Sequence, residues 1–136
     1  MAKHFQGKTV DGVAVTLWPT IHKEAAKHPH FTILVMSEDE AITDRQRRWY
    51  KGICLKALSD DGNTKEWWDL EVKKHCGGLA MLKKETFLLE NGEYVGRLTT
   101  VGVSRKNMTE FIENIISEAI TRGWPVPPPD ADLRRT

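Results

Sequence analysis

A long amphipathic pattern near the C-terminus constrains the fold most, because it predicts a helix that must bury one face in a core. Its apolar side chains recur at helical spacing: Met108, Phe111, Ile112, Ile115, Ile116, Ala119 and Ile120. Asn107 precedes Glu110 by three residues, which is typical of a helix start, and Gly123 suits a helix end. The sequence therefore predicts a helix between Asn107 and Gly123.

The length and composition of the chain fit a folded domain. A chain of 136 residues can bury roughly two-thirds of the surface that it exposes when unfolded. Hydrophobic residues make up 40% and charged residues 29%, a mixture that excludes a disordered chain. No stretch is apolar enough for a secretory signal or a membrane span, so we expect a cytoplasmic protein with no membrane partner. Cys54 and Cys76 form neither a CxxC pair nor a disulfide framework, which predicts two reduced thiols.

Strand signals appear in three places. Asp11-Gly12 predicts a β-hairpin within residues 3–17, and Asn91-Gly92 predicts a second one between residues 86–89 and 94–101. The run Phe31–Met36 is apolar and rich in β-branched residues, which predicts a central strand buried on both faces.

Three further helices complete the expected fold. They span residues 19–28, a stretch that begins at the N-cap Thr43 and reaches Leu58, and a stretch from the N-cap Thr64 to His75. The sequence thus predicts an α+β fold, a small mixed or antiparallel sheet with three to four helices, in a single compact domain of residues 1–124. Because four of the six prolines lie between Trp124 and Asp130, we expect residues 125–136 to form an extended Pro-rich tail.

Motifs of the common enzyme classes are absent from the sequence. There is no nucleophile elbow, Walker loop, dinucleotide glycine fingerprint or HExxH motif, so we predict no catalytic residue and no cofactor. His22, His28 and His30 are the densest group of histidines, but they lack the paired spacing of zinc ligands. Binding is therefore a better first hypothesis than catalysis.

Acidic residues crowd the end of the predicted central strand and leave a second hypothesis open. They are Glu38, Asp39, Glu40 and Asp44. Carboxylates gathered at a strand end can hold Mg²⁺, which leaves a metal-dependent nuclease open as an alternative function. The simpler interpretation is that these carboxylates complement the dipole of the following helix.

A basic stretch at the start of the second predicted helix is the main candidate for a binding site. It contains Arg45, Gln46, Arg47, Arg48 and Lys51, and Arg105 and Lys106 add a second basic pair. Arginine and lysine bind phosphates, and the neighbouring Trp49 and Tyr50 could stack on splayed bases. In the alternative interpretation, both aromatic residues belong to the core and the cations form a solvated helix face.

Tryptophans supply a third hypothesis, a protein-interaction module without catalysis. Trp67 and Trp68 are adjacent on a predicted helix, so one of them must leave the core unless another surface covers it. Trp124 begins the Pro-rich tail. These three residues are therefore predicted interface residues.

Several stretches of the second half can be compared with known families. Thr43-Asp44-Arg45-Gln46-Arg47-Arg48-Trp49 opens one helix, Thr64-Lys65-Glu66-Trp67-Trp68 opens another, and Ser104-Arg105-Lys106-Asn107 precedes the last. Together with Gly123-Trp124-Pro125-Val126-Pro127, they resemble the NinB/Orf family of bacteriophage recombination proteins over residues 43–129. In the Ser-x-x-Gln-Asn-Arg-x-x-Trp motif of that family, Thr43, Gln46 and Arg48 fit the pattern. Arg47 stands in place of its Asn and Lys51 in place of its Trp.

This resemblance implies a homodimeric recombination accessory protein that binds single-stranded DNA. It further implies work alongside the host single-strand-binding protein and help in loading a strand-exchange protein, without catalysis. Gln46 and Arg48 would lie at the shared site, with Thr43 at the helix start. The family's Asn and Trp are lost, whereas Arg47 and Lys51 add positive charge to this face.

Overall fold

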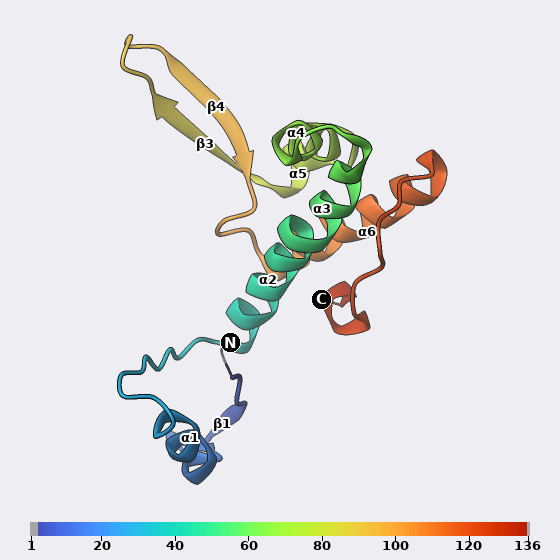
Figure 1. Cartoon of the computed structure of the whole chain (residues 1–136). Coiled ribbons are helices and arrows are strands. Elements are labelled where there is room, and N and C mark those ends of the chain that lie inside the picture. Colours follow the sequence, from blue (N-terminus) through green and yellow to red (C-terminus); the bar gives the residue numbers. More distant parts are fainter. Residues whose placement is uncertain (1–2, 136) are drawn as a thin grey trace. The chain divides into compact units, whose positions relative to one another are not determined.

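The computed structural model describes residues 3–135 and confirms the α+β class, with helices beside two small antiparallel sheets (Figure 1). The contacts divide the chain into two compact units, Met1–Val35 and Met36–Thr136, where the sequence predicted one domain followed by a tail. Within the described residues, no helix is both long and apolar enough to cross a membrane.

The N-terminal unit contains the first predicted hairpin and a short helix. Strand β1 (Gly7–Val10) pairs antiparallel with β2 (Val13–Thr16), and Val10 lies opposite Val13. Both turn residues have positive φ, 50° at Asp11 and 78° at Gly12, as a type I′ turn requires. Helix α1 (Trp18–Ala25) begins with a proline in its first turn, where the missing N–H costs nothing.

The central strand predicted at Phe31–Met36 is wrong, because these residues form no strand. Each sheet in the described part of the chain has two strands, and neither includes this run. Leu34 is 76% exposed and Val35 is 87% exposed, so the apolar run is not buried on either face. A strand needs a neighbour for its backbone hydrogen bonds, and the local pattern of side chains does not supply one.

The C-terminal unit begins with α2 (Glu38–Trp49), which continues through a π-helical stretch (Tyr50–Cys54) into α3 (Leu55–Leu58) and a 3₁₀ turn (Ser59–Asp61). The predicted N-cap Thr43 is wrong, since the Ser37 side chain caps α2 and accepts a hydrogen bond from the Glu40 N–H at 3.2 Å. Three acidic residues in the first turn also favour this earlier start. Thr43 instead lies inside the helix, where its hydroxyl donates to the Glu40 carbonyl at 3.1 Å.

Helix α4 (Lys65–His75) is capped by Thr64, as predicted, and a short α5 (Gly78–Met81) follows it. The second predicted hairpin pairs β3 (Lys83–Leu88) with β4 (Tyr94–Thr99), and Leu88 lies opposite Tyr94. It extends away from the helices of its unit (Figure 1).

Helix α6 (Arg105–Arg122) supplies one wall of the core and begins earlier than predicted. Its N-cap is Ser104, whose hydroxyl accepts from the Asn107 N–H at 3.2 Å, so the predicted cap Asn107 is wrong. Gly123 ends the helix with φ 72°, as expected. At the centre of the core, the rings of Tyr50 and Phe111 meet edge to face at 5.3 Å.

The two cysteines are free and buried, in agreement with the expectation of reduced thiols. Burial raises the pKa of Cys54 and that of Cys76 to about 12. Because the thiolate is the reactive form, both side chains act as small core hydrophobes.

The chain returns to the helices after its proline stretch. A 3₁₀ turn (Ala131–Arg134) places Leu133 in the core at 5% exposure. Arg134 makes two hydrogen bonds to Glu113 of α6, at 2.7 and 3.0 Å. The Leu133 carbonyl accepts from the Gln46 side chain. This segment is therefore part of the packed unit.

Candidate nucleic-acid interface

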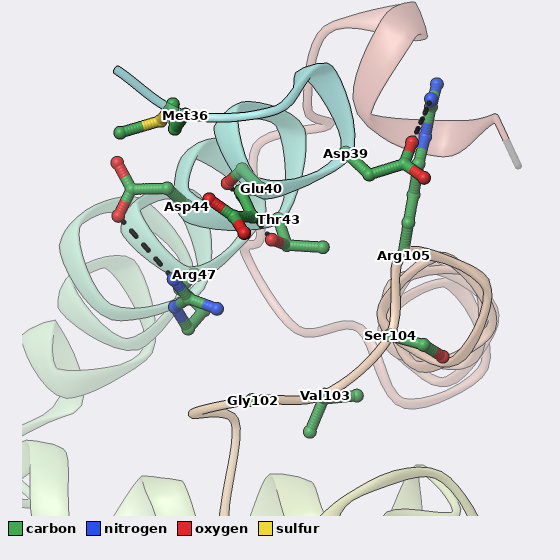
Figure 2. A pocket seen from close by; sticks show the side chains of 10 residues that line it. All are labelled: Met36, Asp39, Glu40, Thr43, Asp44, Arg47, Gly102, Val103, Ser104 and Arg105. Carbon is green, nitrogen blue, oxygen red and sulfur yellow. Dashed lines mark hydrogen bonds and ion pairs between the residues drawn. The ribbon is translucent and has the colours of Figure 1, made fainter. Parts of the chain in front are cut away.

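One basic residue of α2, Arg47, and one of α6, Arg105, line a groove of about 500 Å³ (Figure 2). Its lining comes from α2 and the residue Met36 before it, and from the loop and first residue of α6: Met36, Asp39, Glu40, Thr43, Asp44, Arg47, Gly102, Val103, Ser104 and Arg105. We call this the α2–α6 groove. It is lined by both Arg47 and Arg105, which belong to two basic stretches that are far apart in the sequence.

Arg47 and Arg105 of this groove, and the neighbouring Arg48, form ion pairs with acidic residues. Arg47 lies 3.7 Å and Arg48 lies 2.5 Å from the Asp44 carboxylate, while Arg105 lies 3.2 Å from Asp39. Most of these side chains remain partly exposed to solvent. Exposed pairs of this kind contribute roughly 0–1 kcal/mol, so a phosphate can replace the carboxylate at small cost.

Arg45 points to the C-terminal tail. Its guanidinium lies 2.6 Å from Asp132 and 3.6 Å from Asp130. The hydrogen bond from Arg45 lowers the pKa of Asp132. Two tail carboxylates therefore occupy a cation that the sequence assigned to DNA binding.

Gln46 does not belong to an exposed surface, which corrects its predicted role as a DNA contact. It is 0% exposed, and its Nε2 donates to Thr109 Oγ1 at 3.0 Å and to the Leu133 carbonyl at 2.9 Å. Helical spacing explains this position, because Gln46 shares the inward face of the helix with Trp49 and Tyr50. Its amide links α2, α6 and the C-terminal tail.

Trp49 and Tyr50 are also buried, at 4% and 0% exposure. The interpretation that places both in the core is therefore confirmed, and neither can stack on a base in this structure. The Tyr50 hydroxyl donates to Asp69 at 2.6 Å, and burial raises the pKa of Tyr50. A neutral phenol is the form that can act as this donor.

Two predicted DNA-binding lysines are exposed. Lys51 follows α2, and Lys106 lies in the first turn of α6. Neither makes an ion pair with any residue between positions 3 and 135. Both can therefore accept an anion without losing a protein partner.

No metal site is assembled within the described residues. No group of three or more His, Cys, Asp or Glu side chains there is placed to hold an ion. Asp39 and Asp44 face arginines instead. Two of the four acidic residues of the nuclease hypothesis, Asp39 and Asp44, thus pair with arginines of the DNA-binding hypothesis.

The three predicted interface tryptophans form one cluster. Trp67 and Trp68 meet edge to face at 5.0 Å, and Trp68 meets Trp124 at 5.6 Å. Trp67 remains 45% exposed, while the Trp68 Nε1 donates to Asp61 at 3.0 Å. Arg122 also contacts this cluster, although it was not among the predicted interface residues: its guanidinium lies over the Trp124 ring at 5.7 Å. Its place in the last turn of the amphipathic helix, two residues before Trp124, was the available signal.

Comparison with known proteins finds no matching family model, no matching curated protein and no matching solved structure.

Proposed function

We propose that this protein binds single-stranded DNA at the α2–α6 groove, as a recombination accessory protein of the NinB/Orf type. The observation that carries the proposal is that Arg47 and Arg105, distant in the sequence, line one groove. Arg48 and Lys51 extend the positive charge along the same helical stretch. Cations that two elements bring to one groove can contact a phosphate backbone once they leave the carboxylates beside them.

The expected binding mode is electrostatic. Trp49 and Tyr50 are buried, so this surface offers cations to phosphates and no aromatic face to bases. Binding should therefore depend strongly on salt and weakly on base sequence. Help in loading a strand-exchange protein, contact with a host single-strand-binding protein and a homodimeric state are part of the proposal through the family resemblance alone.

The double variant Arg47→Ala/Arg48→Ala tests the groove together with Arg48, the adjacent cation of α2. Loss of two phosphate contacts should weaken binding about 25-fold at roughly 0.1 M salt and reduce the slope of log affinity against log salt by about 1.4. The measurement is fluorescence anisotropy of a labelled poly-dT oligonucleotide at two salt concentrations, with EDTA present.

Lys56→Ala/Lys65→Ala is the matched control, since both lysines are exposed and lie outside the groove lining. It removes the same charge and should change affinity much less. Equal losses in the two double variants would show attraction to net charge alone. Absence of wild-type binding at low salt would refute the proposal.

Asp44→Asn separates DNA binding from the nuclease alternative. Asp44 pairs with both Arg47 and Arg48, so its neutralisation removes one negative charge that competes with phosphate and should tighten oligonucleotide binding up to about fivefold at roughly 0.1 M salt. A nuclease that uses Asp44 as a metal ligand would instead lose its cleavage. Binding is measured by anisotropy in EDTA, and cleavage is measured on gels with Mg²⁺. Magnesium-dependent cleavage by wild type that disappears in Asp44→Asn would favour the nuclease.

A further inference from the structure

Residues of α4, α5 and β4 line a second groove within the C-terminal unit. Its volume is about 470 Å³, and Leu70, Leu79, Leu98, Lys73, Lys74 and Arg97 contribute side chains to it. We call it the α4–α5 groove. It shares no lining residue with the α2–α6 groove.

The apolar part of this groove is open to solvent. Leu70 is 66% exposed and Leu79 is 87% exposed. Trp67 lies three residues before Leu70 on α4 and is 45% exposed, so helical spacing puts both on one face. Exposed apolar side chains that gather beside a cavity, rather than being scattered, are typical of an interaction site.

Gly78 lines the base of the groove, where only a residue without a side chain fits. A Cβ atom at Gly78 would lie 2.5 Å from the Lys73 carbonyl oxygen and 3.1 Å from Leu98 Cδ1. Only glycine therefore lets α5 pass this close to the end of α4 and to β4. Lys73 ties the same elements together, because its Nζ donates to Asp69 at 2.8 Å and to the Leu98 carbonyl at 2.7 Å. The groove is thus built into the packing.

The charges beside the leucines define the kind of partner. Lys74 is exposed and makes no ion pair with any residue that the structure describes. Arg97 is 62% exposed, lies 3.2 Å from Glu85 and lies over the Phe87 ring at 4.7 Å. The Asp69 carboxylate already accepts from Lys73 and from the Tyr50 hydroxyl. Lys74 is therefore available to an incoming ligand, Arg97 is available once it leaves its exposed pair with Glu85, and the groove's own carboxylate is occupied.

We propose that the α4–α5 groove binds an acidic peptide segment of another protein that carries apolar side chains. Leucine or phenylalanine side chains of the peptide would pack on Leu70 and Leu79, and its carboxylates would pair with Lys74 and Arg97. Trp67 lies beside the groove, but none of the residues that line the groove is aromatic, so the groove itself offers no row of stacking faces and fits a peptide better than a nucleic acid. Charge complementarity and the apolar floor together determine this choice.

The test uses a labelled synthetic peptide in which aspartate alternates with leucine and phenylalanine, with binding followed by fluorescence anisotropy. Leu70→Ser and Lys74→Glu should each weaken binding by about tenfold or more. Leu70→Ser removes an apolar contact with the peptide, and Lys74→Glu replaces a cation that pairs with its carboxylates. Lys56→Glu, the same charge change outside the groove, should leave binding nearly unchanged. Since Leu70 and Lys74 are exposed, neither substitution removes a core contact.

Two altered peptides keep the test independent of protein folding. Replacing every aspartate by asparagine, or every leucine and phenylalanine by alanine, should abolish binding to the wild-type protein. Poly-dT should neither displace the acidic peptide nor lose affinity in Lys74→Glu. The proposal is overturned if wild type fails to bind the peptide at about 1 mM, where even a weak complex would be detected. It is also overturned if Leu70→Ser and Lys74→Glu bind the peptide like wild type, or if poly-dT competes for this groove.

Discussion

Phe111→Ala is expected to lower the free energy of unfolding of the C-terminal unit by about 3–5 kcal/mol. Phe111 is 0% exposed and meets Tyr50 edge to face at 5.3 Å. Alanine would leave a cavity between α6 and the helical stretch that follows α2, and it would remove the aromatic contact. Urea denaturation followed by circular dichroism measures the change.

Phe87→Ala is the matched control, because it is the same substitution in the β3–β4 hairpin. Phe87 is 42% exposed and contacts Arg97, so its loss should cost about 1 kcal/mol or less. A loss for Phe111→Ala as small as that for Phe87→Ala would show that the two rings do not form the centre of the core.

Local signals predicted many of the elements. The hairpin turns at Asp11-Gly12 and Asn91-Gly92, the cap at Thr64 and the helix end at Gly123 each depend on the chemistry of a few adjacent residues. Two caps were displaced because several residues near each helix start could act as caps. Ser37 precedes Thr43, and three acidic residues follow Ser37 in the first turn of the helix, which favours the earlier start.

The burial of Gln46 could have been predicted from the sequence. It precedes Trp49 by three residues and Tyr50 by four, so one helix face must hold all three. Its membership in a charged stretch suggested exposure, whereas its amide is the buried link to Thr109 and Leu133.

Long-range pairing could not be predicted from local patterns. Nothing in the sequence joins Arg47 to Arg105, or Arg45 to Asp132, because these contacts depend on how α2, α6 and the C-terminal tail pack. The same limit explains Phe31–Met36, whose composition is that of a strand although no neighbour pairs with it.

Leu133→Ala should lower stability and at the same time strengthen DNA binding. Leu133 is 5% exposed, and its truncation should cost about 2–3 kcal/mol, the lower part of the usual range, because the exposed residues around it can adjust. Loosening this segment should also withdraw Asp130 and Asp132 from Arg45. One additional phosphate contact would raise affinity for poly-dT about fivefold at roughly 0.1 M salt. Urea denaturation and fluorescence anisotropy measure the two effects.

Two variants separate these effects. Leu89→Ala makes the same change at a residue that is 43% exposed, and it should alter neither quantity appreciably. Asp130→Asn/Asp132→Asn frees Arg45 while Leu133 stays buried, so it should raise affinity with little loss of stability. If Leu133→Ala instead weakens DNA binding, the C-terminal tail supports the binding surface. A rise in affinity in both Leu133→Ala and the double Asp variant would instead mean that the tail carboxylates compete with DNA phosphates for Arg45.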